Sequence, residues 1–378
     1  MKRNYLVFGF VILLLSAFID SARGPLLPII SQSLSLPYGR CSWFLVAGNF
    51  AAVAVNFLLF PLLHFFGQKH TLTLIGIFGV LSGLLVPWVS GFASLMAIGA
   101  AFGSLIAMMG SMCNLLVIRG SDPKSRSNTL CGLHVMYGVG ALTAPTVASI
   151  LLQNGWGWRA IFATIAPFFL LLTISSAKWF PKDSAIRAST FRQSLAIAPK
   201  QILFLLAFST YVAGEITISM WMTTYLLEAQ HVPVVQGATY VAGFFLVMAL
   251  SRAGCIWVLK AHHEIVVVWG ALILTVVFFL LGLLGHLWAF PLCGILGPFF
   301  PVFLAWTSRL YPEQSRSLTL WILTSVQLTL ALANILIGKL TDQFGVAPTY
   351  RLAFVWLGAA MLFLALCLRL GGKKELAS

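Results

Sequence analysis

The most constraining feature of this sequence is a repeat at half the chain length. The segment SRSNTL at residues 125–130 returns as SRSLTL at residues 315–320, 190 positions later in a chain of 378 residues. Each copy follows a proline, lies between two long apolar runs and is expected to form a short basic loop. An aromatic-Arg-x-x-Phe pattern at 158–162 also recurs at 350–354. This offset predicts one membrane-spanning unit written twice, an architecture found mainly in transporters.

Composition places the chain in a membrane. Hydrophobic residues make up 60% of the sequence and charged residues 8%, which leaves too few charges to cover a soluble domain of this length. Apolar stretches of about 20 residues, long enough to cross a bilayer as helices, recur along nearly the whole chain, and the alternating pattern of a membrane barrel is absent. We therefore predict an all-α polytopic protein with spans near 5–30, 42–67, 70–91, 92–119, 128–153, 156–179, 201–228, 234–260, 264–286, 287–309, 317–344 and 348–371.

The predicted spans divide into two pseudo-symmetric bundles of six helices. The N-terminal bundle covers residues 1–180, a cytoplasmic linker covers 181–200, and the C-terminal bundle covers 201–378. The six cysteines are scattered and form neither a disulfide framework nor a metal-binding spacing. The polar loops contain no nucleophile motif and no phosphate-binding glycine loop. We expect no metal, no cofactor and no enzymatic activity.

The net charge of +14 could indicate a nucleic-acid partner, but the distribution of the charge does not. With the N-terminus inside, 17 of the 23 Lys and Arg residues lie in cytoplasmic segments, four lie in outer segments, and two lie within spans. This positive-inside bias predicts that both termini are cytoplasmic. We expect a multi-pass monomer in a bacterial inner membrane whose partners are the lipid bilayer and a small-molecule substrate.

Two charged residues lie deep in the first predicted span. Asp20 and Arg23 are three residues apart and therefore share one helix face. Because a charge at mid-bilayer costs about 2.5–3.5 kcal/mol on insertion scales, each needs a reason to be there. One interpretation is an internal ion pair that only stabilises the fold. The other is a substrate-binding or proton-responsive pair that faces a central cavity.

Glu215 is the third deep charge, near the middle of the seventh span, which is the counterpart of the first. No Lys or Arg lies within a helical turn or two of it, so a local ionic partner is not evident. Such a carboxylate could take up and release a proton near neutral pH. The alternatives are pairing with Arg23 across the halves, or a hydrogen bond that keeps the side chain neutral. All of these interpretations place Glu215 in the cavity.

Several uncharged polar residues also lie within spans. His134 in the fifth span could bind a hydroxylated ligand, titrate, or form a packing hydrogen bond. Interhelical hydrogen bonding is the default role for Asn114, Gln327 and Asn334, and Gln327, near mid-span, is the best cavity candidate of the three. Trp221 near the outer end of the seventh span either belongs to an interfacial aromatic belt or stacks on a sugar-like ring.

The overall plan resembles the major facilitator superfamily. Two sets of six spans, a basic central loop and the corner GWGWR at 155–159 carry this resemblance over the whole chain. The loop signature after the second span departs from the family, because GQKH at 67–70 lacks the usual Asp-Arg pair. Its second-half equivalent survives only as Ser251-Arg252. The resemblance thus implies a gating and helix-packing role for Arg252 instead of a ligand contact.

A narrower resemblance, over roughly a quarter of the chain, is to the fucose permease-like branch of sugar:proton symporters. It rests on Asn114, on LHVMYGVGALTAP at 133–145, and on Glu215 followed by WMTTYL at 221–226. Fucose permease has an acidic residue four positions before the span-four Asn, where this chain has Gly110. The coupling proton would therefore have to be carried by the carboxylate of Asp20 or Glu215. Close helix approach and bending are expected in the fifth span at Gly138, Gly140 and Pro145.

The sequence predicts a secondary active transporter that moves a small polar, sugar-like solute by alternating access, with proton symport as the energy source. We expect the substrate site to contain Asp20, Arg23, Asn114, His134, Glu215, Trp221 and Gln327. Export of amphipathic compounds or import of a metal chelate such as a siderophore is the alternative within transport. Outside transport, the alternative is a membrane sensor built on the same fold.

Overall fold

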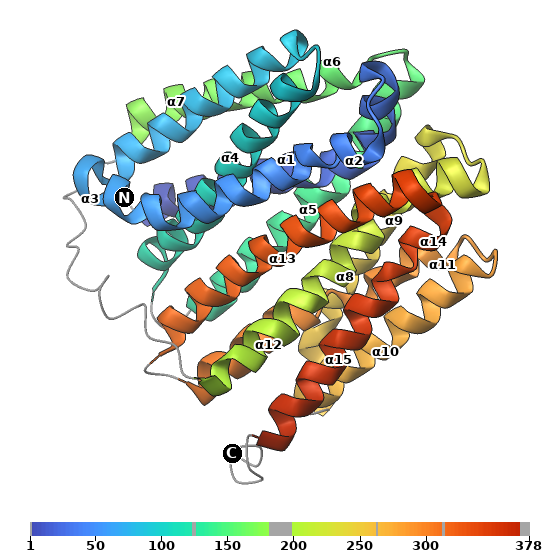
Figure 1. Ribbon diagram of the computed structural model, residues 1–378. Helices are drawn as coiled ribbons and strands as arrows, with labels where there is room; N and C mark the ends of the chain where they lie inside the picture. The colour runs from blue at the N-terminus through green and yellow to red at the C-terminus, as the bar shows by residue number, and fades with distance from the viewer. Residues whose placement is uncertain (1, 123–125, 181–198, 262–263, 312–313, 371–378) are drawn as a thin grey trace.

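The protein is described by a computed structural model that covers residues 2–122, 126–180, 199–261, 264–311 and 314–370 (Figure 1). The long helices are α1 (Lys2–Leu34), α3 (Trp43–Leu85), α4 (Phe92–Gly120), α5 (Arg126–Gln153), α7 (Ile165–Trp179), α8 (Pro199–Gln230), α9 (Val234–Ala261), α10 (Glu264–Leu283), α12 (Phe299–Leu310), α13 (Ser315–Phe344) and α15 (Leu352–Leu370). Short elements complete the path: α2 (Tyr38–Cys41), η1 (Val86–Trp88), α6 (Trp158–Ala163), α11 (Ala289–Leu292), η3 (Cys293–Leu296) and α14 (Val346–Tyr350).

The predicted all-α membrane fold is confirmed. Among the described residues, twelve helical segments are long and apolar enough to cross a bilayer, and their bounds lie close to the predicted spans. Spans two and three run together as α3, which breaks at Gly67 with φ 69° and ψ 173°. Glycine suits this position because it adopts left-handed φ values at no steric cost. The break coincides with the predicted end of the second span. The predicted linker at 181–200 lies almost entirely outside the described residues.

The two repeat copies form helix starts instead of connecting loops. The described part of the first copy begins α5 at Arg126, and the second copy begins α13 at Ser315. The proline before each copy is compatible with this position, since proline is tolerated at or before a helix start and not in a helix interior. The repeat therefore marks the start of one corresponding helix in each half.

Each half packs as its own bundle. In the N-terminal half, α3 packs against α4 and α7, and α1 packs against α4 and α5. In the C-terminal half, α8 packs against α13 and α15, and α9 packs against α11 and η3. Figure 1 shows the blue-to-green helices as one bundle and the yellow-to-red helices as the other. The most extensive contacts between the halves run along α5 with α9, α3 with α13 and α1 with α8, and α2 also packs against α13.

The halves are bonded to each other at the end of the bundle opposite the termini, which the positive-inside bias predicts to be the outer face. The Tyr38 hydroxyl donates to Glu228 Oε1 at 2.9 Å, and the Gly39 amide donates to Asp342 Oδ2 at 2.7 Å. Toward the face that carries the termini, the ribbons of the two halves diverge (Figure 1). The structure is therefore closed at the predicted outer face.

Close helix crossing in the N-terminal half depends on glycine, and this gives a first prediction. A Cβ atom at Gly103 on α4 would overlap the backbone of Gly48 on α3. We expect Gly103→Val to destabilise the protein by at least the roughly 1–3 kcal/mol that overpacking costs, because two backbones must separate. Gly110→Val is the matched control, since nothing lies within 4 Å of a Cβ at that position on the same helix. Thermal unfolding in detergent measures both, and an equal loss in the two variants would contradict the argument.

Candidate functional site

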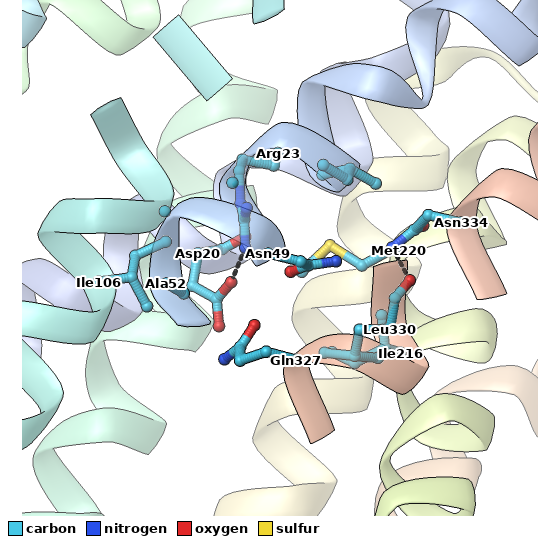
Figure 2. A pocket seen from close by; sticks show the side chains of 13 residues that line it. Asp20, Arg23, Asn49, Ala52, Ile106, Ile216, Met220, Gln327, Leu330 and Asn334 are labelled. Carbon is cyan, nitrogen blue, oxygen red and sulfur yellow. Dashed lines mark hydrogen bonds and ion pairs between the residues drawn. The ribbon is translucent and has the colours of Figure 1, made fainter. Parts of the chain in front are cut away.

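A cavity lies between the two halves, near the middle of the helices that line it. Helices α1, α3 and α4 of the N-terminal half and α8 and α13 of the C-terminal half contribute to its wall. Its volume is about 60 Å³, which is room for a few water molecules. The polar side chains in its lining are Asp20, Arg23, Asn49, Gln327 and Asn334 (Figure 2). Binding a solute of sugar size would require the halves to move apart.

Asp20 and Arg23 form an ion pair in the wall of this cavity. Arg23 Nη2 donates to Asp20 Oδ1 within α1, as their spacing on one helix face allows. The second carboxylate oxygen of Asp20 accepts a hydrogen bond of 2.9 Å from the hydroxyl of Tyr137 on α5. Both charged side chains are largely buried, with 17% of Asp20 and 8% of Arg23 exposed. The pair is thus held by a third group and still borders the cavity.

Three carboxamides line the cavity from the other helices. Asn49 comes from α3, while Gln327 and Asn334 come from α13 of the opposite half. Figure 2 shows the Gln327 side chain directed toward Asp20 across the space between the halves. Asn334 is fixed on both sides, because its Nδ2 donates to the Leu330 carbonyl at 2.9 Å and its Oδ1 accepts from Trp221. Asn49 and Gln327 are therefore the carboxamides better placed to turn toward a solute.

Glu215 lies on α8 beside the cavity but is not in its lining, where Ile216 and Met220 take its place. The Tyr211 hydroxyl, one helical turn earlier, donates to Glu215 Oε2. Tyr211 is in turn stacked on Phe299 at a ring-centroid distance of 3.9 Å. Glu215 is half-buried. Each half therefore contains one deep carboxylate that accepts a hydrogen bond from a tyrosine.

Arg252 on α9 lies near Tyr137, and its charge reaches both of these tyrosine–carboxylate pairs. Its guanidinium carbon is 5.9 Å from the ring centroid of Tyr137, in the opposite half, and its charge acts on Glu215 and Tyr211 in its own half. Its Nε donates to the Gly297 carbonyl at 3.0 Å, which ties α9 to the chain before α12. Arg252 thus forms a hydrogen bond between two segments of the C-terminal half. Its position beside the deep carboxylates was not foreseen from the sequence.

Three other predicted site residues lie outside the lining of the cavity. The Asn114 amide donates to the Gly110 carbonyl of its own helix at 2.8 Å. The His134 ring lies 6.4 Å from that of Phe300 in the opposite half. Trp221 is completely buried, and its Nε1 donates to Asn334 at 3.2 Å. In this conformation the indole ring therefore meets neither lipid nor a solute.

The small residues of the fifth span allow close approach to α1 and α9. A Cβ at Gly140 would meet the Ala17 side chain at 2.8 Å, and one at Gly138 would meet Ala249 in the opposite half at 3.1 Å. Pro145 lies inside α5, as expected. Gly138 therefore lies at a contact between the halves, which is where a rocking motion would act.

Comparison with known proteins places this geometry in a family. The family model described as Major Facilitator Superfamily matches residues 9–320. The chain belongs to the major facilitator superfamily. It is thus a membrane transporter protein and not an enzyme. No curated protein sequence matches it.

Solved structures of major facilitator transporters have the same fold. A bacterial homolog of the human lysosomal transporter Spinster, in an inward-facing and occupied conformation, has a TM-score of 0.76 and 15% identity, with 100% of this chain and 98% of that chain covered. A variant of the nucleoside transporter NupG has a TM-score of 0.74 and 13% identity, with 97% and 99% covered. A variant of the E. coli fucose:proton symporter FucP has a TM-score of 0.65 and 14% identity, with 96% and 98% covered.

Proposed function

We propose that this transporter moves a small, polar, sugar-like solute across a bacterial inner membrane by alternating access and proton symport. The observation that carries the proposal is the set of five polar side chains, from both halves, around one cavity. A bound solute that touches both halves would couple their movement, because each half holds part of its binding site.

The chemistry of the lining favours a neutral solute with several hydroxyl groups. Carboxamides both donate and accept hydrogen bonds, as do hydroxyls, and the ion pair adds one acceptor and one bidentate donor. Apolar side chains such as Ile106, Ile216 and Leu330 complete the wall and suit the C–H faces of a sugar ring. None of the described lining residues is aromatic, so stacking on a flat ring is not offered in this conformation.

Glu215 is the better of the two candidate proton carriers. Protonation of Asp20 would break its ion pair with Arg23, whereas protonation of Glu215 breaks no ion pair among the described residues. Glu215 accepts a hydrogen bond from Tyr211, and its negative charge attracts the Arg252 guanidinium. Protonation of Glu215 would remove this attraction. A proton on Glu215 can therefore change the contacts of the opposite half through Arg252 and Tyr137.

Uptake by the purified protein in liposomes tests the proposal. The panel contains monosaccharides, nucleosides, a metal chelate and a lipophilic cation, each with and without an imposed proton gradient. Accumulation of a polar solute that requires the gradient supports proton symport, and accumulation unaffected by the gradient overturns it. Outward movement of the lipophilic cation would replace the proposal with drug export, and import of the chelate would replace it with chelate uptake. Movement of none of them would favour a sensor.

The two movable carboxamides give a second prediction. We expect Asn49→Ala and Gln327→Ala each to raise the apparent KM of the transported solute about 2- to 10-fold, since a net hydrogen bond contributes about 0.5–1.5 kcal/mol. Asn154→Ala removes the same group from an exposed position at the end of α5 and should leave KM unchanged. Initial uptake rates over a range of concentrations measure all three. Unchanged KM values in both cavity variants would show that the solute does not bind to these two carboxamides.

A further inference from the structure

A second cavity, of about 580 Å³, lies between α1 and α7 near the face that carries the termini. We propose that this α1–α7 groove binds one anionic phospholipid of the adjacent leaflet. The groove is lined by residues 3–15 of α1 and residues 168–179 of α7, and it is separate from the central cavity. Lipid binding at this groove does not depend on the proposed function.

The apolar part of the groove has the depth of one leaflet. On α7 the lining runs from Trp179 to Phe168, which is about 16 Å along a helix. Half of a bilayer core is about 15 Å. Val11 on α1 and Leu171 on α7 are exposed at 42% and 61%, while Phe8 between the two helices is buried and forms part of the floor. The groove can therefore accept an acyl chain along its length.

The mouth of the groove is polar and positively charged. Arg3 lines it with an exposed side chain, and the exposed Lys178 places its Nζ 5.8 Å from the Trp179 ring centroid. Asn4 Nδ2 donates to the Trp179 carbonyl at 2.9 Å and ties α1 to α7 at this level. None of the described lining residues is acidic. Arg and Lys bind phosphate groups, and Trp is enriched at the headgroup level, so this mouth suits an anionic lipid headgroup.

The groove is not a general result of the two-fold plan. In the C-terminal half the corresponding helices are α8 and α15, and these pack along each other extensively, whereas α1 touches α7 at few positions. Gly214 permits this packing, since a Cβ there would lie 2.7 Å from the Leu357 side chain. The first and last spans of the C-terminal half are therefore packed together, whereas those of the N-terminal half are mostly apart.

Quenching of Trp179 by brominated lipid tests the proposal on the full chain. The protein is reconstituted with brominated phosphatidylglycerol or brominated phosphatidylcholine, and the Trp179 signal is obtained by difference from Trp179→Phe. We expect half-maximal quenching at an about 30-fold lower fraction of the anionic lipid, because Arg3 and Lys178 each add about 1 kcal/mol of attraction to an anionic surface and about 1.4 kcal/mol is a factor of ten. The double variant Arg3→Gln/Lys178→Gln should lose this preference.

The matched control is Lys69→Gln/Arg369→Gln, which removes the same charge from the same face outside the groove. This variant should retain the preference for anionic lipid. Equal quenching by both lipids would show ordinary boundary lipid and overturn the proposal. Equal loss of preference in the two double variants would show a general surface-charge effect and also overturn it. Native mass spectrometry of the detergent-released protein provides a second measurement, with one retained phosphatidylglycerol expected and none in the groove variant.

Discussion

Glu215→Gln is expected to abolish accumulation driven by a proton gradient while leaving solute exchange across the membrane close to the wild-type rate. Glutamine has the size of glutamate and can still accept the hydrogen bond from Tyr211, but it cannot bind and release a proton. A symporter that loses its proton carrier still binds solute and changes conformation. Accumulation against a gradient should therefore fall to the equilibrium level.

Two assays on the same liposomes separate these outcomes. Uptake with an imposed pH gradient reports coupling, and counterflow of labelled solute without a gradient reports exchange. Glu264→Gln is the control, since Glu264 is a carboxylate paired with Arg309 at the predicted cytoplasmic end of α10. It should behave as wild type in both assays. If Glu215→Gln still accumulates solute under the gradient, Glu215 is not the carrier.

Asp20→Asn should behave differently from Glu215→Gln because Asp20 forms an ion pair with Arg23 and also lines the cavity. The substitution removes the ion pair and leaves a largely buried guanidinium without its carboxylate, which costs several kcal/mol in other proteins. We expect loss of both accumulation and exchange. A variant that keeps exchange and loses only accumulation would transfer the proton-carrying role to Asp20.

The fold could be predicted from the sequence because it depends on properties that single segments display. Spans in lipid must satisfy their own backbone hydrogen bonds as helices, so length and apolar composition determine them. The positions of the breaks follow from local chemistry as well, as Gly67 illustrates with its positive φ. The Asp20–Arg23 pair was visible for the same reason, since three residues along one helix bring two side chains together.

The hydrogen-bond partners of the charged residues could not be predicted. They lie on other helices, or they are residues whose sequence context does not indicate such a bond. Tyr137 is 117 positions from Asp20, and its hydroxyl reaches the carboxylate only after α1 and α5 have packed. Tyr211 is one turn before Glu215, and a tyrosine in an apolar span gives no sign of donating to a carboxylate. Asn49, a polar residue within the predicted second span, was the one missed cavity residue with a readable signal.

The environment of Trp221 could not be predicted from its position along the span. Its place near the outer end of the seventh span indicated an aromatic belt or a stacking surface for a sugar. The end of α8 is instead covered by the opposite half, because Tyr38 bonds to Glu228 there and its ring lies 6.2 Å from that of Trp221. The indole is therefore buried, and its one donor is satisfied by Asn334. The position of a residue along a span does not indicate whether its face of the helix packs against another helix or is exposed to lipid.

Gly338→Val is expected to hold the transporter open at its predicted outer face and abolish transport. In the closed structure a Cβ at Gly338 on α13 would lie 2.8 Å from Ser42 Cβ and 3.1 Å from Gly39 Cα in the opposite half. The Gly39 amide at this contact also donates to Asp342 Oδ2 at 2.7 Å, so separation of the helices also breaks that bond. Overpacking of about 1–3 kcal/mol plus one charge-assisted hydrogen bond would shift a balanced equilibrium at least tenfold toward the open state.

The shift can be measured as a distance across the closed face. Nitroxide labels at Arg40→Cys and Lys339→Cys report the separation of α2 and α13, which should lengthen in Gly338→Val, while solute binding from outside persists and uptake is lost. Gly358→Val on α15 is the control, because nothing lies within 4 Å of a Cβ there. Lost uptake with an unchanged distance would indicate local damage, and normal uptake would show that this glycine contact does not close the outer face. The expected combination of a longer distance, retained binding and no uptake would occur only if the contact between Gly39, Ser42 and Gly338 is the one that each transport cycle must break and remake.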